Sequence, residues 1–365
     1  MKKPYEHLYI HVPFCATKCA YCAFYSAIDE EALIPEFLNK MDEEFKKYGP
    51  SCLPLKSVFF GGGTPTLLDA PDLERLLLSV KSNFTIGPDT EITLECNPET
   101  MNDDKAQVIA KHATRISMGL QSFSQQNRKT IGRKGDCNDV FKAVDLLRKH
   151  NFTNIGLDLI YAIPGQSLED WEIDLRAAVD IGTPHISAYS LSIDEGAALA
   201  RGKTREAKDD ISCDMWELAE KVLNEYGLER YEISNYAKPG HECIHNSGIW
   251  AGDAYIGCGP SAASFDGLDR WQQPSNLEKW LAEEKPTVDE IPPESRAREI
   301  FIMGLRTNKG WGKEEFSNQT GYDYTPWLAE IDQFLQYNFI TLTDHSISLT
   351  TEGLAFWNTI CEELV

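Results

Sequence analysis

The sequence lacks any apolar run close to the roughly 18 residues that a membrane-spanning helix needs, and it lacks an excess of basic residues. Its 35 Lys and Arg stand against 57 Asp and Glu, so the net charge is −22. A chain this acidic repels phosphate backbones, and we expect no nucleic-acid partner. The first residues, Met-Lys-Lys-Pro-Tyr-Glu-His, lack the apolar centre of a secretion signal, which favours a cytoplasmic protein.

Repeats, low-complexity tracts and blocks of like charge are absent too, which argues against the fibrous and disordered classes. The chain has 365 residues, enough for one large and one smaller domain. Ten cysteines in a protein of the reducing cytoplasm do not indicate a disulfide framework. Seven of them are scattered, but three crowd into one short segment and need another explanation.

Short apolar runs alternate with amphipathic segments over the first 200 residues. The predicted strands are Leu8–Val12, Ser57–Phe60, Glu91–Glu95, Arg115–Leu120, Asn154–Ile160 and His185–Leu191. The predicted helices lie near 30–48, 71–83, 103–112, 138–149 and 168–181, with a further one at 209–226. This alternation predicts an α/β fold with a parallel sheet, as a partial (β/α)6 barrel over residues 1–285. A doubly wound sheet is the alternative.

The sequence pattern changes at Pro286-Thr-Val-Asp-Glu-Ile-Pro-Pro, which we interpret as a linker. Helices near 294–307, 313–320 and 325–337 follow, then a hairpin around residues 344–346 and a last helix. Residues 286–365 therefore form a predicted C-terminal, winged-helix-like α+β module. Its five basic and thirteen acidic side chains favour a structural cap on the barrel over DNA binding.

The three crowded cysteines, Cys15, Cys19 and Cys22, form a C-x3-C-x2-C pattern directly after the first predicted strand. Parallel sheets place their functional loops at the carboxyl ends of strands, so this pattern indicates a metal site. A [4Fe–4S] cube normally takes four cysteines, and three thiolates would leave one iron open to a small chelating molecule. The alternative is structural zinc, with His11 or a distant cysteine as the fourth ligand.

The glycine-rich segment Gly61–Pro65 follows the second predicted strand, and its backbone N–H groups could approach a ligand closely. No lysine follows it, so it is not a Walker A loop; a simple tight turn remains the alternative. Polar side chains also end the later strands, namely Glu95, Gln121, Ser190 and Ser192, and Asp158 interrupts the fifth strand. We expect these groups to share one pocket. For each of them the alternative is a hydrogen-bonded core residue.

The cysteine loop, with Tyr21 before Cys22, and the glycine segment resemble the radical S-adenosylmethionine (SAM) superfamily. Other stretches are similar to its oxygen-independent coproporphyrinogen III oxidase-like group, over nearly the whole chain. These stretches are Tyr9–Cys15, Phe60–Thr66, Gly119–Phe123, Asp158–Tyr161 and Tyr231–Ala237. The resemblance implies the radical-SAM partial barrel with its C-terminal module.

That group has two branches, the coproporphyrinogen III dehydrogenase and the HemW-type haem chaperone. The dehydrogenase carries another cysteine two residues past the third and an extra N-terminal segment, whereas this loop continues Cys22-Ala-Phe-Tyr25 after a short N-terminus. Both differences favour a chaperone that binds haem and transfers it to an unidentified acceptor protein. Radical decarboxylation of coproporphyrinogen III is the alternative, and enzyme activity is left open. Contact with a membrane is expected only through the acceptor.

The resemblance also implies roles for individual residues. Cys15, Cys19 and Cys22 would ligate a [4Fe–4S] cluster. The residues expected to bind SAM are Tyr9, Tyr21, Gly63, Thr64, Glu95, Gln121, Arg133, Asp158, Ser192 and Ala263, with Glu95 accepting from the ammonium group. The chaperone motif His-Asn-x-x-Tyr-Trp reads His245-Asn-Ser-Gly-Ile249-Trp250 here, with Ile249 in the tyrosine position. His245 would then ligate haem; on its chemistry alone, a histidine in such a loop is more often a hydrogen-bonding residue than a ligand.

Overall fold

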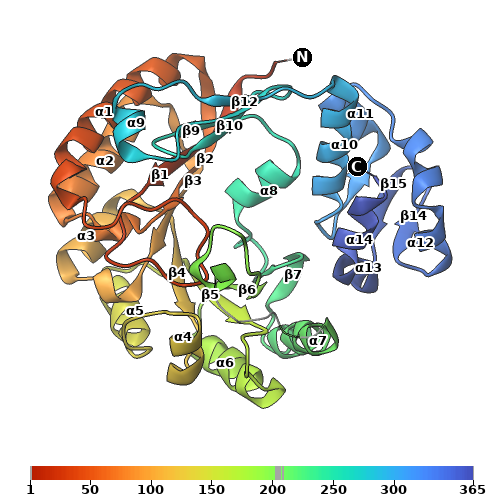
Figure 1. The fold of residues 1–365 in the computed structure, drawn as a ribbon, viewed down its shortest axis with the longest axis horizontal. Helices are drawn as coiled ribbons and strands as arrows, with labels where there is room; N and C mark the ends of the chain where they lie inside the picture. The colour runs from red at the N-terminus through yellow and green to blue at the C-terminus, as the bar shows by residue number, and fades with distance from the viewer. Residues whose placement is uncertain (1, 202–206, 208, 365) are drawn as a thin grey trace.

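The computed structural model describes residues 2–201, 207 and 209–364. This part of the chain forms one twelve-stranded sheet and one three-stranded sheet (Figure 1). The strand order of the large sheet is β12-β11-β10-β9-β1-β2-β3-β4-β5-β6-β8-β7. Strands β1 to β6 are parallel and neighbour each other in chain order, as expected for successive βα units.

The central strands are largely buried. They are β1 (Tyr5–Val12), β2 (Cys52–Gly62), β3 (Ile86–Cys96), β4 (Arg115–Gln121), β5 (Ile155–Tyr161) and β6 (His185–Ser190). The helices are α1 (Ile34–Tyr48), α2 (Ala70–Asn83), α3 (Asp103–His112), α4 (Gln125–Thr130), α5 (Asp139–Lys149), α6 (Leu168–Asp180) and α7 (Asp209–Glu225). These helices lie along the outer side of the curved sheet in Figure 1, so the partial (β/α)6 barrel is confirmed and the doubly wound alternative is wrong.

Local sequence signals explain where several of these helices begin. The side chains of Asp69 and Asn102 accept hydrogen bonds from the first turns of α2 and α3. Ser167 and Asp170 form a reciprocal capping box at the start of α6. Such caps satisfy backbone N–H groups that have no partner within the helix, and each typically stabilises it by about 1 kcal/mol.

Short strands extend the sheet at both edges, and sequence periodicity did not predict them. They are β7 (Glu229–Glu232), β8 (Asn235–Ala237), β9 (Tyr255–Cys258), β10 (Ala263–Phe265), β11 (Arg270–Gln272) and β12 (Thr287–Asp289). Strand β9 is parallel to β1, and the other five pair antiparallel. Strand β12 lies inside the segment interpreted as a linker and pairs with β11. Helices α8 (Ile244–Trp250) and α9 (Leu277–Leu281) connect this region.

The C-terminal part is a small α+β module, as predicted. Its helices are α10 (Pro293–Gly304), α11 (Lys313–Thr320), α12 (Asp332–Gln336), α13 (Thr351–Ala355) and α14 (Trp357–Glu362), and its strands are β13 (Trp311–Gly312), β14 (Ile340–Leu342) and β15 (Ser346–Leu349). The helix expected over 325–337 is divided, because residues 325–330 form a 3₁₀ helix before α12. Packed aromatic rings, among them Phe301, Phe316 and Trp327, form its core.

The module is attached to the barrel side by a buried ion pair. Arg306, just after α10, donates from Nε to the fully buried carboxylate of Glu232 on β7 at 3.0 Å. Its guanidinium also lies over the ring of Trp250 at the end of α8, 4.5 Å from the ring centre.

None of the helices in the described residues is long and apolar enough to cross a membrane. The domain division after residue 285 stays a prediction.

Candidate functional site

The three crowded cysteines lie on the loop that leaves the carboxyl end of β1. The loop folds back on itself, because Cys15 N donates to Ala27 O at 3.1 Å and Cys22 N to Cys19 O at 3.2 Å. All three thiols are partly exposed. The pKa of Cys15 is raised, first by burial and then by the neighbouring thiols of Cys22 and Cys19. A thiolate at Cys15 therefore needs a positive charge beside it, which a metal cluster supplies.

A single-ion site is less well supported. Among the described residues, no three His, Cys, Asp or Glu side chains are placed to hold one metal ion, whereas each thiolate of an iron–sulfur cluster binds a different iron. His11, the fourth ligand in the zinc alternative, is already bonded at both ring nitrogens. Its Nδ1 lies 3.1 Å from the Tyr9 hydroxyl and its Nε2 3.0 Å from Tyr25 O. The donor set thus fits an iron–sulfur cluster better than zinc.

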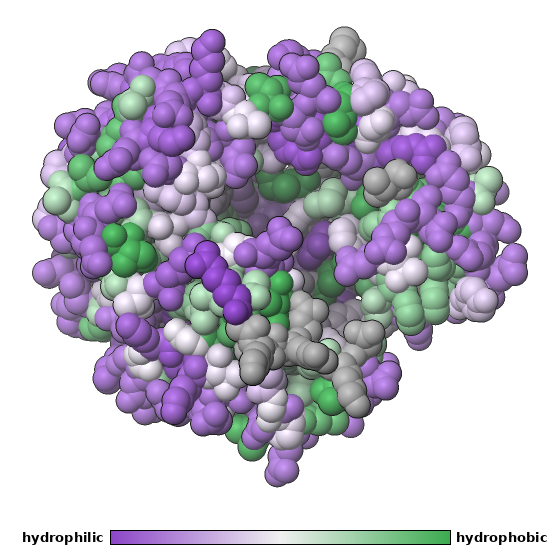
Figure 2. Space-filling model, viewed as in Figure 1, coloured by the Kyte–Doolittle hydropathy of each residue, from purple (hydrophilic) through white to green (hydrophobic). Residues whose placement is uncertain are grey.

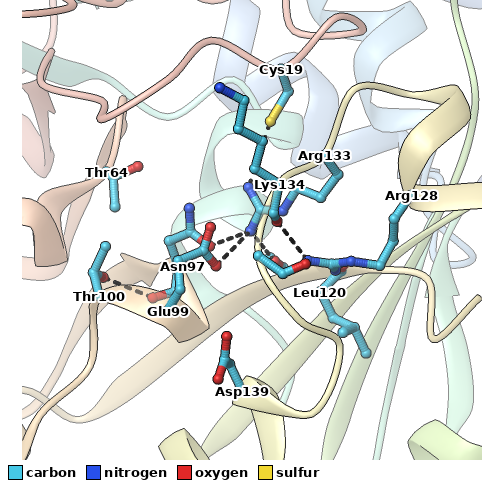
Figure 3. Close-up of polar contacts among 12 residues, drawn as sticks. Cys19, Thr64, Asn97, Glu99, Thr100, Leu120, Arg128, Arg133, Lys134 and Asp139 are labelled. Atoms are coloured by element: carbon cyan, nitrogen blue, oxygen red, sulfur yellow. Dashed lines mark hydrogen bonds and ion pairs between the residues drawn. The ribbon is translucent and has the colours of Figure 1, made fainter. Parts of the chain in front are cut away.

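Arg133 places a cation beside this loop (Figure 3). Its Nη1 lies 3.7 Å from Cys19 Sγ, and its Nη2 donates to Asn97 Oδ1 and Gly119 O. Arg128 fixes the same stretch of chain by donating to Leu120 O at 2.6 Å and Lys134 O at 2.8 Å (Figure 3). Arg133 is therefore held between the ends of β3 and β4 and the cysteine loop.

The glycine segment at the end of β2 packs directly on the start of the cysteine loop. Gly63 N donates to Val12 O, and Thr64 N donates to Phe14 O, each at 2.8 Å. The Thr64 hydroxyl lies 3.6 Å from Cys15 Sγ. A Cβ atom on Gly63 would lie 2.5 Å from Pro13 O, so only glycine allows this approach. The segment is a tight turn that also positions Thr64 at the cysteine loop.

Replacing Gly63 tests how far the two loops depend on each other. We expect Gly63→Ala to lower the free energy of unfolding by about 1–3 kcal/mol, because the backbone of Pro13 must move to admit the methyl group. Gly87→Ala is the control, since the φ of Gly87, like that of Gly63, is not positive and its Cβ would make only an ordinary contact with Thr90 Oγ1 at 3.7 Å. Chemical denaturation measures both. A Gly63 variant more stable than the control variant would contradict the packing described.

Glu95, at the end of β3, is a carboxyl group with few donors around it. Its Oε2 accepts one hydrogen bond, from Gly62 N at 3.1 Å. Burial raises the pKa of Glu95 to about 8, and the nearby charge of Asp158 adds to this effect. Asp158 on β5 has a partner of its own, the Ser117 hydroxyl, at 2.9 and 3.0 Å. A ligand with an ammonium or amino group would supply the donors that Glu95 lacks.

Gln121 ends β4 in a strained conformation. Its φ is +77°, and the register between β4 and β5 shifts here. Its Oε1 is buried without a hydrogen-bond partner, an arrangement that costs free energy unless a ligand donates to it. A Cβ on Gly119 would lie 3.0 Å from Gln121 Nε2 and 3.7 Å from Arg133 Nη2, so these two side chains are neighbours. The structure thus brings Glu95 near Asp158, and Gln121 near Arg133.

Tyr21 packs on the small apolar cluster around Ile131 and Leu199, and its hydroxyl interacts with Cys19 and Arg133. Two other predicted residues, Ser192 and Ala263, lie farther apart. Ser192 is exposed and donates to Asp194 at 3.0 Å on the loop after β6. Ala263 lies on β10, on the other side of β1 in the strand order. A shared contact of Ser192 and Ala263 with one ligand stays a prediction.

A cavity of about 580 Å³ lies between the cysteine loop and α8. Figure 2 shows a hollow in the middle of this face, where Figure 1 places α8. The residues that line it include Tyr9, Lys18, Phe24, Tyr25, His245, Ile249 and Ala263. Phe24 is 70% exposed, so an aromatic ring stands open beside the cavity. Sequence reasoning did not predict that His245 and Tyr9 would share this space.

His245 is firmly held at the start of α8. Glu91 on β3 accepts from Ile244 N and His245 N, each at 3.1 Å, and so caps the helix. The imidazole stacks on Phe59 with ring centres 5.0 Å apart, and its Nδ1 lies 2.8 Å from the Ser57 hydroxyl. Burial, with the neighbouring His7 and Arg115, lowers the pKa of His245 to about 3. The ring is therefore neutral at physiological pH and can offer a nitrogen lone pair.

Sequence reasoning missed several polar residues of this region, notably His7 and Ser57. A signal was present: His7, Tyr9 and His11 alternate along β1, so they share one face of an otherwise apolar strand. Polar side chains repeated on one face of a buried strand indicate that this face lines an interior site.

Comparison with known proteins supports one family. Residues 9–178 match the model of the radical SAM superfamily, and residues 291–356 match that of the HemN C-terminal domain. The solved structure of the radical SAM enzyme coproporphyrinogen III oxidase (HemN) from Escherichia coli superposes with a TM-score of 0.86. It shares 20% sequence identity, and the match covers 99% of this chain and 90% of HemN. This likeness shows the fold.

Curated relatives narrow the family further. The haem chaperone HemW of Haemophilus influenzae is 32% identical, and the match covers 99% of this chain and 98% of the relative. The HemW proteins of Lactococcus lactis and Escherichia coli are each 30% identical with 98% of the relative covered. The chain therefore belongs to the HemW-type family of the radical SAM superfamily.

Proposed function

We propose that this protein is a haem chaperone, which binds haem and transfers it to an acceptor protein. The observation that carries the proposal is the neutral, buried His245 beside a cavity of about 580 Å³. Imidazole nitrogen is a common axial ligand of haem iron. The full-length similarity to relatives named haem chaperones supports the same function.

We also propose that the barrel holds a [4Fe–4S] cluster and SAM. When bound, this pair would supply one-electron reductive chemistry at the sulfonium centre of SAM. The thiolates of Cys15, Cys19 and Cys22 would hold the cluster, and the cation of Arg133 beside Cys19 would offset their charge. Glu95 would accept from the amino group of SAM, and the unpaired Gln121 Oε1 would accept a further hydrogen bond.

Further polar groups around this site would complete the binding of SAM. Thr64 lies beside Cys15, and Gly63 brings backbone N–H groups close to the loop. Asp158, Tyr9 and Tyr21 would line the site, with the backbone near Ser192 and Ala263 flanking the adenine. In this arrangement the chain binds and orients SAM and excludes water from it, while the reactive chemistry belongs to the cofactors.

A haem titration tests the function. We expect His245→Ala to bind haem at least tenfold more weakly than the wild type and with a shifted Soret band, because the iron loses a nitrogen ligand. His345→Ala is the matched control, since His345 is exposed on the C-terminal hairpin. Equal affinity and equal spectra for His245→Ala and the control would remove the proposed haem site.

The same protein distinguishes the chaperone from the dehydrogenase. Incubation of the anaerobically reconstituted protein with coproporphyrinogen III, SAM and a reductant should leave the porphyrinogen unchanged. The third cysteine of the loop is followed by Ala23, the exposed Phe24 and Tyr25, with no further thiol. Formation of protoporphyrinogen would establish the dehydrogenase in place of the chaperone.

We place the protein in the cytoplasm, with an unidentified acceptor as its partner and membrane contact only through that acceptor. The cysteines of the loop and those of the core, such as Cys96 and Cys258, are free thiols, which fits a reducing compartment.

A further inference from the structure

A chain of hydrogen-bonded side chains runs between α8 and strands β1 and β2 and ends at His245. Asp253 Oδ2, in the turn after α8, lies 3.3 Å from His7 Nε2. His7 Nδ1, on β1, lies 2.7 Å from the Ser57 hydroxyl on β2. The same hydroxyl lies 2.8 Å from His245 Nδ1. His7, Ser57 and His245 are 1%, 0% and 5% exposed, so water does not compete for these bonds.

Asp253 sets the direction of the donors along this chain. Hydrogen bonding to His7 and the charge of Lys56 lower the pKa of Asp253, although its burial acts in the opposite sense. An ionised carboxylate only accepts, so His7 Nε2 must donate to it. The neutral form of His7 that donates from Nε2 presents an unprotonated Nδ1, and in that form the Ser57 hydroxyl donates its single proton to Nδ1.

The Ser57 hydroxyl then has no second proton to donate to His245. Its oxygen can only accept from His245 Nδ1–H, which leaves the lone pair of a neutral His245 on Nε2. None of the described residues is hydrogen-bonded to that Nε2, and His245 lines the cavity. Histidines that bind metals commonly donate their other ring N–H to an oxygen acceptor in this way, which fixes the tautomer and raises the basicity of the ligand.

We propose that Asp253, His7 and Ser57 are positioning residues that hold His245 in the tautomer whose Nε2 ligates the iron of the bound haem. This inference rests on the proposed function and adds to it the group of residues that prepares the ligand. The packing of α8 supports it, because a Cβ on Gly248 would lie 2.4 Å from His7 Nε2. Glycine at that position lets the His7 ring lie against the helix that carries His245.

The tautomer can be tested by breaking the chain and by reversing it. Ser57→Ala removes the shared hydroxyl. Asp253→Asn reverses the chain, because its Oδ1 can keep the bond from Gln319 Nε2 (3.3 Å) while its amide N–H₂ faces His7. Donation to His7 Nε2 moves the His7 proton to Nδ1, which makes Ser57 donate to His245 and puts the His245 proton on Nε2.

We expect both variants to bind ferric haem about 10- to 100-fold more weakly than the wild type, the range typical for loss of a partner behind a metal ligand. Resonance Raman spectroscopy of the ferrous complex should show a shifted or missing iron–histidine stretch. Thr93→Val is the matched control, since it removes a buried strand hydroxyl that has no partner. Ser57→Thr, unlike Ser57→Ala, keeps a hydroxyl at this position and should therefore show the wild-type iron–histidine stretch.

The possible outcomes separate this inference from the proposed function. If His245→Ala changes haem binding while Ser57→Ala and Asp253→Asn match Thr93→Val in affinity and Raman spectrum, the positioning role is wrong and the haem site stands. If His245→Ala itself has no effect, the haem site fails, and the positioning role fails with it. Should Ser57→Ala unfold at a lower temperature than Thr93→Val, the nearly isosteric Asp253→Asn decides the matter.

Discussion

Anaerobic reconstitution with iron and sulfide should leave Cys15→Ala, Cys19→Ala and Cys22→Ala colourless, while the wild type becomes brown. Each thiolate holds a different iron of the proposed cluster, so two ligands remain in any of these variants. The three thiols interact with each other and with Arg133, and no nearby cysteine of the loop can replace a lost one. We therefore expect each variant to lose the chromophore, measured by absorbance near 400 nm. Each should also retain about a tenth or less of the wild-type iron content.

Cys52→Ala is the control for this experiment. Cys52 is also partly exposed, but it lies at the start of β2, at the opposite end of that strand from the glycine segment, and its thiol donates to Tyr48 O at 3.5 Å. Burial raises the pKa of Cys52 to about 12, so its thiol is a poor ligand. Loss of colour in Cys52→Ala, or zinc without iron in the wild type, would show that the ligands were assigned wrongly.

Glu95→Gln should weaken SAM binding about 100-fold and yet stabilise the protein without ligand. The loss of affinity follows from replacing a charged acceptor by a neutral one, since hydrogen bonds to charged groups contribute about 1.5–3 kcal/mol. The gain in stability follows from the raised pKa of about 8, because folding near neutral pH forces this carboxyl to take up a proton. Calorimetric titration and chemical denaturation measure the two effects separately.

The pH dependence of the free energy of unfolding shows in which direction Glu95 acts. In the unfolded chain Glu95 ionises near 4.5, and in the folded chain near 8. Stability from this group is therefore present below pH 4.5, falls as the pH rises to about 8, and is constant above it. The cost at pH 7 is at most about 3 kcal/mol. Glu95→Gln should lack this slope, and the wild type should bind SAM more weakly as the pH falls below 8.

Glu44→Gln serves as the control, because Glu44 is a buried carboxyl outside the site. Burial raises the pKa of Glu44 too, but its carboxylate oxygens accept from Gly259 N at 2.8 Å and from Trp280 Nε1 at 3.0 Å. The amide of Gln can accept only one of these two bonds, so the replacement should not stabilise the protein as Glu95→Gln does, and it should leave SAM binding unchanged. A Glu95→Gln protein that is less stable than the wild type at pH 7, with the same pH slope, would contradict the view that Glu95 lacks donors.

The sequence by itself determined the barrel and the place of its cysteine loop. Six apolar runs alternate with amphipathic helices, and a pattern repeated over ten or more residues carries enough local information to define each unit. The position of Cys15, Cys19 and Cys22 after the first strand, and of Gly61–Pro65 after the second, then followed from strand order. Parallel strands bring their carboxyl ends to one edge of a sheet, whatever their distance along the chain.

Only the tertiary structure decided the rest. Strands β7 to β12 have three or four residues each, too few to show a period, and they exist because their partners are already in place. Ser57 and His245 are 188 residues apart, and no local pattern could join them. The raised pKa of Glu95 likewise comes from its burial beside Asp158 on another strand. Contacts between distant segments, and the removal of water that they cause, set the state of these groups, whereas local periodicity sets only the elements that carry them.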